Sequence, residues 1–193
     1  CKAWNTISEV RLISASNSTK NDRFSGYAGE TRAKIQTLSE ISLQETPRFT
    51  SGFKELDRVL GGGIVPGSAI LIGGHPGAGK STLLLQVMCG LAKNMTALYV
   101  TGEESLQQVA MRANRLNLPT DKLNMLSETS VEQICNLADQ LKPQIIVVDS
   151  IQVMHLSDIQ SSPGSVAQVR ECASFLTRYA KTRQVAIIMV GHV

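Results

Sequence analysis

The sequence predicts an α/β domain in which a parallel sheet is covered by helices on both faces. Four short apolar runs are nearly unbroken, which is typical of strands buried on both faces. Segments with helical apolar spacing lie between these runs. Strands and helices that alternate at such lengths form right-handed βαβ units, and these units build a parallel sheet. The expected strands are 69–74, 97–102, 144–150 and 185–191.

The expected helices are recognised by apolar residues that recur every three or four positions. A short helix at 53–60 is closed by three glycines, and a further helix covers 130–141. Three helix starts carry a Ser-x-x-Gln capping box, at Ser105, Ser130 and Ser165. The remaining apolar stripes are Leu83, Leu84, Val87, Met88 and Leu91; Leu106, Val109, Ala110, Ala113 and Leu116; and Val166, Val169, Ala173, Leu176 and Ala180.

Length and composition exclude several classes of protein. A chain of 193 residues, 42% hydrophobic and 18% charged, suits one folded domain rather than a disordered segment. It has no long uncharged apolar run, which argues against a membrane span. The net charge of +3 permits a nucleic-acid partner without demanding one. Four cysteines without a C-x-x-C pair indicate reduced thiols and a cytoplasmic location.

The chain divides near residue 46. Residues 1–46 are rich in Ser, Asn, Thr, Lys and Gly and read as a linker, with a short ordered piece at 35–43. Residues 47–193 carry the expected core. Because the chain begins with cysteine rather than methionine and stops inside an expected buried strand, we expect a fragment whose core is truncated at the C-terminus.

The strongest functional signal is a G-x-x-x-x-G-K-[ST] motif between a strand and a helix. Its glycines let successive backbone N–H groups face phosphate, and the helix N-terminus adds partial positive charge. Lys80 would reach the β- and γ-phosphates, Ser81 would bind Mg²⁺, and Thr82 would lie near the α-phosphate. The alternative is a plain glycine-rich turn. The motif comprises Gly74, His75, Pro76, Gly77, Ala78, Gly79, Lys80 and Ser81.

Acidic and imidazole side chains follow the other expected strands. Asp149 ends an apolar run, where a carboxylate can hold Mg²⁺ at the sheet rim or merely cap the next segment. Glu103 and Glu104 follow the second strand, and one of them, with Glu103 preferred, would deprotonate the attacking water. The alternative is structural, because acidic side chains in the first turn of a helix interact favourably with the helix dipole. His192 follows the last strand and either senses the γ-phosphate or has a structural role.

Two surface features are candidates for partner binding. The basic side chains on or after the last helix could contact DNA phosphates. The alternative, which is more common for such charges, is that they form a solvent-exposed helix face. The polar stretch 156–164 contains Pro-Gly and is expected to be a mobile loop that meets a partner. The basic residues are Arg170, Arg178, Lys181 and Arg183.

Together these motifs closely resemble a RecA-like family of bacterial DNA repair ATPases. The resemblance is carried by GFKELDRVLGGGIVPGSAILIGGHPGAGKSTLLLQV, YVTGEESLQQVAMRA, VVDSIQVM and SSPGSVAQVRE, and runs through the whole chain. It implies a RecA-like P-loop ATPase that uses ATP with Mg²⁺ and is stimulated by single-stranded DNA. It also implies branch migration of recombination intermediates by a hexameric, helicase-like ring that works beside a recombinase filament. The family's site residues match Lys80, Ser81, Glu103 and Asp149.

The resemblance also implies parts that this chain lacks. The family has a four-cysteine zinc module ending just before an AWNT stretch, so CKAWNT makes Cys1 the last ligand, with three absent. One thiolate cannot complete a tetrahedral zinc site, so we expect zinc in the full-length protein and not in this chain. Cys89, Cys135 and Cys172 read as packing residues. The family's Lys-Asn-Arg-Phe-Gly motif and Lon-protease-like domain are expected beyond Val193.

Two other classes of function stay open. A nucleotide switch in a ring assembly, similar to the circadian clock ATPase, would carry the same glycines and acidic pair. The Cys1 remnant favours the repair family over that switch. A DNA-binding module without catalysis is a third reading, and the intact P-loop lysine and strand-end aspartate argue against it.

Overall fold

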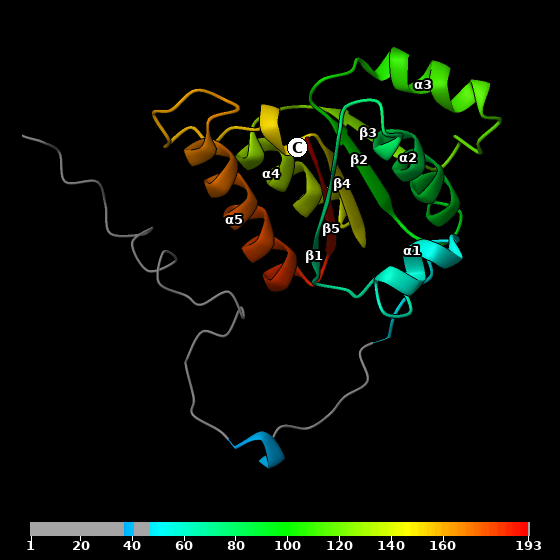
Figure 1. Cartoon of the computed structure of the whole chain (residues 1–193), viewed down its shortest axis with the longest axis horizontal. Coiled ribbons are helices and arrows are strands. Elements are labelled where there is room, and N and C mark those ends of the chain that lie inside the picture. The colour runs from blue at the N-terminus through cyan, green and yellow to red at the C-terminus, as the bar shows by residue number, and fades with distance from the viewer. Residues whose placement is uncertain (1–36, 41–46, 193) are drawn as a thin grey trace, which may run out of the picture.

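Five parallel strands form one sheet at the centre of the protein (Figure 1). The computed structural model describes residues 37–40 and 47–192. The strands lie side by side in the order β1-β5-β4-β2-β3, so the predicted parallel sheet is confirmed. Their bounds are β1 Ala69–Gly74, β2 Ala97–Thr101, β3 Asn124–Ser127, β4 Ile145–Asp149 and β5 Ala186–His192.

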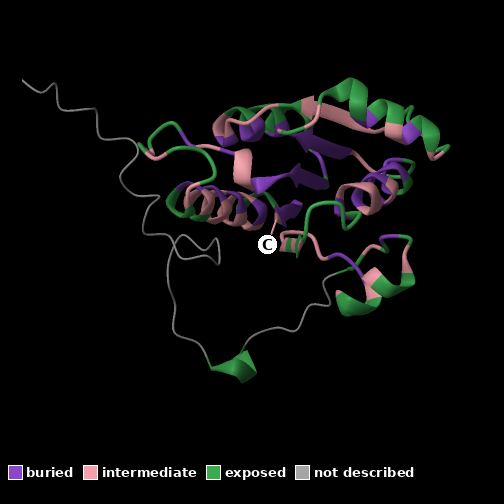
Figure 2. Ribbon diagram, turned by 45° about the horizontal axis from the view of Figure 1, so that its top comes forward, coloured by how far each residue is buried: buried purple, intermediate pink, exposed green. Residues whose placement is uncertain are grey.

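Helices cover both faces of this sheet, as predicted. One core cluster joins the sheet to α1, α2 and α3, and a second joins its other face to α4 and α5. Because side chains alternate along a strand, Tyr99 and Val147 point into the first cluster, while Val100 and Val148 point into the second. Figure 2 shows the buried strands between helices whose outer faces are exposed. The helices are α1 Lys54–Val59, α2 Lys80–Leu91, α3 Leu106–Arg115, α4 Val131–Leu141 and α5 Val166–Arg183; the short 3₁₀ segments are η2 Leu38–Glu40 and η3 Ile151–Val153.

The sequence analysis missed β3, the short edge strand at Asn124–Ser127. β3 pairs with β2 alone, so only one of its edges is hydrogen-bonded within the sheet. Its side chains are half-buried or exposed rather than fully buried. A strand of this kind needs no continuous apolar run, and the apolar pattern therefore did not reveal it.

The capping-box prediction holds fully only at Ser105. There the Ser105 hydroxyl accepts from the Gln108 backbone N–H, and the Gln108 side chain accepts from the Ser105 N–H. Ser130 and Ser165 also accept from the backbone N–H three residues on. At Ser165 the prediction of a reciprocal bond, from the Ser165 N–H to the Gln168 side chain, is wrong. The Gln168 side chain is buried and donates instead to the carbonyls of Leu156 and Ser161.

The buried face of α3 also differs from the predicted stripe. Val109 and Ala113 are buried, whereas Ala110 and Leu106 are exposed. The inward face is instead completed by Arg112, whose side chain is only 15% exposed. A charged residue therefore occupies a position that an apolar pattern does not identify as buried.

The loop at 156–164 is tied to the helices on either side of it. Glu132 of α4 accepts hydrogen bonds from the Ser157 N–H at 2.8 Å and from its hydroxyl at 2.7 Å. Gln168 of α5 binds the Leu156 and Ser161 carbonyls, as described above. These bonds connect the loop to the core, and whether it meets a partner stays a prediction.

Three cysteines lie inside the helical layers. Cys89, Cys135 and Cys172 are free, buried thiols on α2, α4 and α5. Burial raises the pKa of Cys135 to about 12 and that of Cys172 to about 11. Cys1 and most of the expected linker lie outside the described residues. Within the expected ordered piece at 35–43, the described residues Leu38–Glu40 form a helical turn.

Candidate nucleotide-binding site

The loop between β1 and α2 has the backbone shape that a phosphate-binding loop requires. Gly77 and Gly79 adopt left-handed conformations, with φ of 80° and 86°, which side chains with a Cβ rarely adopt. α2 begins at Lys80, directly after Gly79. The loop from His75 to Gly79 is exposed, and Ser81 and Thr82 are half-buried in the first turn of α2. The free N–H groups of this turn therefore border an open loop, which suits an anion.

Lys80, the predicted phosphate-binding lysine, is buried. Only 8% of its surface is accessible. Its ammonium group donates to the carbonyl oxygens of Gly74 at 2.6 Å and His75 at 2.9 Å. These bonds offset the cost of burying a charge. Lys80 thus holds the loop that it belongs to, in addition to presenting a cation at its mouth.

His192 lies between Lys80 and Glu103. Strands β1 and β5 pair in register, so the ends of both strands lie at the same rim. The Lys80 ammonium donates to Nδ1 of His192 at 3.3 Å, and this contact assigns the ring proton to Nε2. That Nε2 lies 3.6 Å from Oε1 of Glu103. Glu103 also accepts a hydrogen bond from the Ser150 hydroxyl. Lys80 and Glu103, which come from separate segments of the chain, therefore both contact His192, and all three were predicted as site residues.

The two glutamates that the sequence left as alternatives have different surroundings. Glu104 forms an ion pair with Arg112, with 2.8 Å between Oε1 and Nη1. Its backbone is held by the Thr101 hydroxyl, which accepts from the Glu104 N–H and donates to the Glu104 carbonyl. Glu103 contacts Ser150 and the His192 ring instead. The geometry thus separates a glutamate paired with arginine from one that contacts a serine and a histidine.

Asp149 ends β4 beside the end of β2, as predicted. The register pairs it with Thr101, and the Gly102 N–H donates to its carbonyl at 2.9 Å. The fully buried Tyr99 donates its phenol hydrogen to Oδ2 of Asp149 at 2.5 Å. Burial, and then the neighbouring Asp149 carboxylate, raise the pKa of Tyr99 far above its usual range. Tyr99 therefore stays protonated and fixes the orientation of this carboxylate.

A cavity of about 190 Å³ lies at this rim, and Glu104 lines it, whereas Glu103 and Asp149 are not among its lining residues. Its walls come from the P-loop, from the first turn of α2, from α3 and from the end of β5. Backbone N–H groups and the cations of Lys80 and Arg112 face a common space, and this donor set fits the phosphates of a nucleotide. The lining residues are Gly77, Gly79, Lys80, Ser81, Thr82, Glu104, Arg112 and His192.

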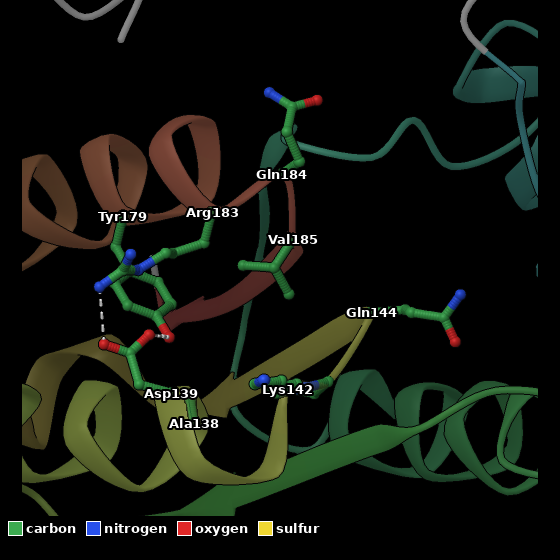
Figure 3. A pocket seen from close by; sticks show the side chains of 9 residues that line it. Ala138, Asp139, Lys142, Gln144, Tyr179, Arg183, Gln184 and Val185 are labelled. Atoms are coloured by element: carbon green, nitrogen blue, oxygen red, sulfur yellow. Dashed lines mark hydrogen bonds and ion pairs between the residues drawn. The ribbon is translucent and has the colours of Figure 1, made fainter.

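A second cavity, of about 540 Å³, lies at the opposite ends of the strands, between α4 and α5 (Figure 3). Asp139 on its wall accepts hydrogen bonds from the Tyr179 hydroxyl and from Arg183, both at 2.8 Å. The charge of Arg183, a predicted candidate for DNA contact, is therefore balanced by a neighbouring acid. Arg170 likewise pairs with Glu171 at 3.2 Å. DNA binding by this face stays a prediction.

The described residues include neither a cluster of metal-ligating side chains nor a helix that could span a membrane. Within the part of the chain that the structure describes, no three or more His, Cys, Asp or Glu side chains gather as a metal-binding group. No described helix has the length and apolar character needed to cross a bilayer. Cys1, the expected zinc-ligand remnant, lies outside the described residues.

The parallel sheet, the P-loop and the acids at the same rim define a RecA-like P-loop NTPase domain. A family model described as an AAA domain matches residues 34–193, and the chain belongs to this family. The chain is 93% identical to the DNA repair protein RadA of Haemophilus influenzae, 71% identical to that of Escherichia coli and 45% identical to that of Bacillus subtilis. Each similarity covers the whole chain and 42% of the relative. The predicted resemblance to a family of bacterial DNA repair proteins is thereby confirmed.

Sequence reasoning missed four residues that shape this site. Tyr99 and Ser150 contact the predicted carboxylates, and Gln152 donates to the His192 carbonyl at 3.2 Å. Arg112 lines the cavity and pairs with Glu104. A tyrosine inside an apolar run is one signal that could have been noticed, because a buried phenol needs a hydrogen-bond partner.

Proposed function

We propose that this domain binds ATP with Mg²⁺ and hydrolyses it. The observation that carries the proposal is the chain of contacts from Lys80 through His192 to Glu103 at the rim above the P-loop. In this proposal a phosphate-binding cation, a polar sensor and a carboxylate base would act together on one bound triphosphate.

The P-loop residues bind the substrate. The N–H groups at the start of α2 would hold the β-phosphate, and the Lys80 ammonium would turn from the loop carbonyls to the β- and γ-phosphates. Ser81 and Asp149 would hold Mg²⁺, and Tyr99 keeps the Asp149 carboxylate oriented. Mg²⁺ neutralises negative charge on the phosphates when it is bound.

Glu103 is the base in this proposal. Its carboxylate would accept a proton from the attacking water, because this group is not paired with an arginine as Glu104 is. His192 contacts both Glu103 and Lys80, so a γ-phosphate that draws Lys80 away would be felt at Nδ1. His192 would thereby report the γ-phosphate to the carboxylate.

We propose further that the whole protein is a DNA-dependent motor. The relatives carry the name DNA repair protein RadA, and the chain spans about two fifths of their length. In this proposal a hexameric ring, driven by ATP, moves on single-stranded DNA and branched recombination intermediates beside a recombinase filament. A zinc module in the full-length protein, with Cys1 as one ligand, belongs to the same proposal.

The test measures ATP turnover by the full-length protein with and without single-stranded DNA. We expect strong stimulation by DNA, near-complete loss of turnover in Lys80→Ala, and a fall of roughly 10²–10⁴-fold in Glu103→Gln with ATP binding retained. Glu104→Gln is the matched comparison. Turnover at the parent rate in Lys80→Ala would refute the P-loop assignment, and collapse in Glu104→Gln alone would move the base to Glu104. ATP turnover without DNA stimulation would favour the nucleotide switch over the motor.

A further inference from the structure

We propose that Arg112 of α3 binds the phosphate chain of the nucleotide as a second cation beside Lys80. The inference rests on the proposed nucleotide binding and adds a residue that lies outside the P-loop and outside the acidic motifs. Arg112 lines the same cavity as Lys80, Ser81 and Thr82. It reaches this cavity from a helix about thirty positions further along the chain.

The placement of Arg112 follows from the inward face of α3. Val109, three residues earlier, and Ala113, one residue later, are both buried against the sheet. Arg112 points the same way, and its side chain is 15% exposed. Arg115, in contrast, is exposed. The helix therefore directs one arginine into the phosphate cavity and leaves a nearby arginine in solvent.

The guanidinium group of Arg112 has unused donors. Nη1 donates to Glu104 at 2.8 Å. Nε and Nη2 are buried, and neither has an acceptor among the described residues. A buried polar group without a partner costs free energy, and a charged one costs more. Two adjacent N–H donors in a fixed plane suit bidentate binding of phosphate oxygens, which would satisfy both nitrogens.

The charges around Arg112 leave it able to bind an anion. Glu104 is a single carboxylate whose side chain is 37% exposed, so water weakens its electrostatic attraction to the guanidinium group. The positive charge of Arg112 also reaches the buried Tyr99, whose raised pKa it partly lowers. Tyr99 in turn donates to Asp149. Tyr99 is therefore an electrostatic neighbour of Arg112 and a hydrogen-bond partner of the proposed magnesium-binding carboxylate.

The experiment compares Arg112→Gln with Arg115→Gln in the full-length protein. Both variants remove one positive charge from α3, but only the first removes it from the cavity. Binding is measured by displacement of a fluorescent ATP analogue with ATP or with adenosine, in the presence of Mg²⁺. We expect Arg112→Gln to weaken ATP binding roughly 10- to 100-fold, as for a lost hydrogen-bonded charge, and to leave adenosine binding unchanged. Arg115→Gln should match the parent.

The outcomes separate this inference from the proposal beneath it. Parent-like ATP affinity in Arg112→Gln, with weakened affinity in Lys80→Ala, overturns the role of Arg112 alone. Parent-like affinity in Lys80→Ala overturns the nucleotide site itself. An equal loss for ATP and adenosine shows a structural role and also overturns the inference. If Arg112→Gln does not fold, Arg112→Lys replaces it, because it keeps the charge and loses the planar pair of donors; unchanged ATP affinity in that variant overturns the inference.

Discussion

Gly102 lies at the end of β2, where neighbouring side chains leave no room for a Cβ. A Cβ at this position would lie 2.5 Å from Cγ2 of Val153, 2.9 Å from Cε of Met154 and 3.2 Å from Cγ2 of Thr129. The methionine end can move aside, but Val153 is β-branched and stiff. Gly102→Ala must therefore push η3 away from the end of β2. Overpacking of this kind lowers the free energy of unfolding by about 1–3 kcal/mol.

The displacement would also reach the site. The η3 residue Gln152 donates to the His192 carbonyl, and Glu103 directly follows Gly102. We therefore expect Gly102→Ala to lower ATP turnover as well as stability. The assay is thermal unfolding followed by circular dichroism, where this destabilisation corresponds to a fall of about 2–10 °C in Tm.

Gly90→Ala is the matched control for this substitution. Gly90 lies in α2, and a Cβ there would meet no atom within 4 Å. Alanine is a better helix former, so this variant should gain about 0.5–1 kcal/mol. A parent-like Tm in Gly102→Ala, measured beside a stabilised Gly90→Ala, would refute the close packing argued for the end of β2.

Two further predictions concern hydrogen-bonded carboxylates. Tyr99→Phe removes the hydrogen-bond donor to Asp149. We expect the free energy of unfolding, measured in urea, to fall by about 1.5–3 kcal/mol, and the Mg²⁺ concentration needed for turnover to rise. Unchanged values for both would contradict the role of Tyr99. At Glu132, burial raises the pKa, but hydrogen bonds from Ser157 and Ser130 outweigh it and hold the pKa below 4.5. Its stabilisation is present above that pH and is lost as the pH falls below it, so the urea midpoint of Glu132→Gln should vary less with pH below about 4.5. If the urea midpoint of the variant falls with pH as steeply as that of the parent, the Glu132 carboxylate is excluded as a cause of the loss of stability in acid.

Much of the candidate site could be located from local patterns. The G-x-x-x-x-G-K-S motif placed the loop, and the carboxyl ends of parallel strands placed Glu103, Asp149 and His192 at one rim. The pairing Gly74↔His192 and Thr101↔Asp149 bears this out. The spacing of motifs along the sequence could not predict which side chains form hydrogen bonds with one another. The bond from the Ser150 hydroxyl to Glu103, for example, joins positions 47 residues apart.

Local sequence patterns are enough to predict the fold class, the alternation of strands and helices, and the P-loop, because each follows from local periodicity or from the conformational freedom of glycine. Tertiary structure alone decided three matters. β3 joins the sheet by pairing with β2 without a continuous apolar run of its own. Lys80 can be buried because loop carbonyl oxygens accept hydrogen bonds from its ammonium group. Arg112 enters the phosphate cavity because α3 packs with Val109 and Ala113 against the sheet, and the rotation of a helix about its axis depends on its neighbours rather than on its own residues.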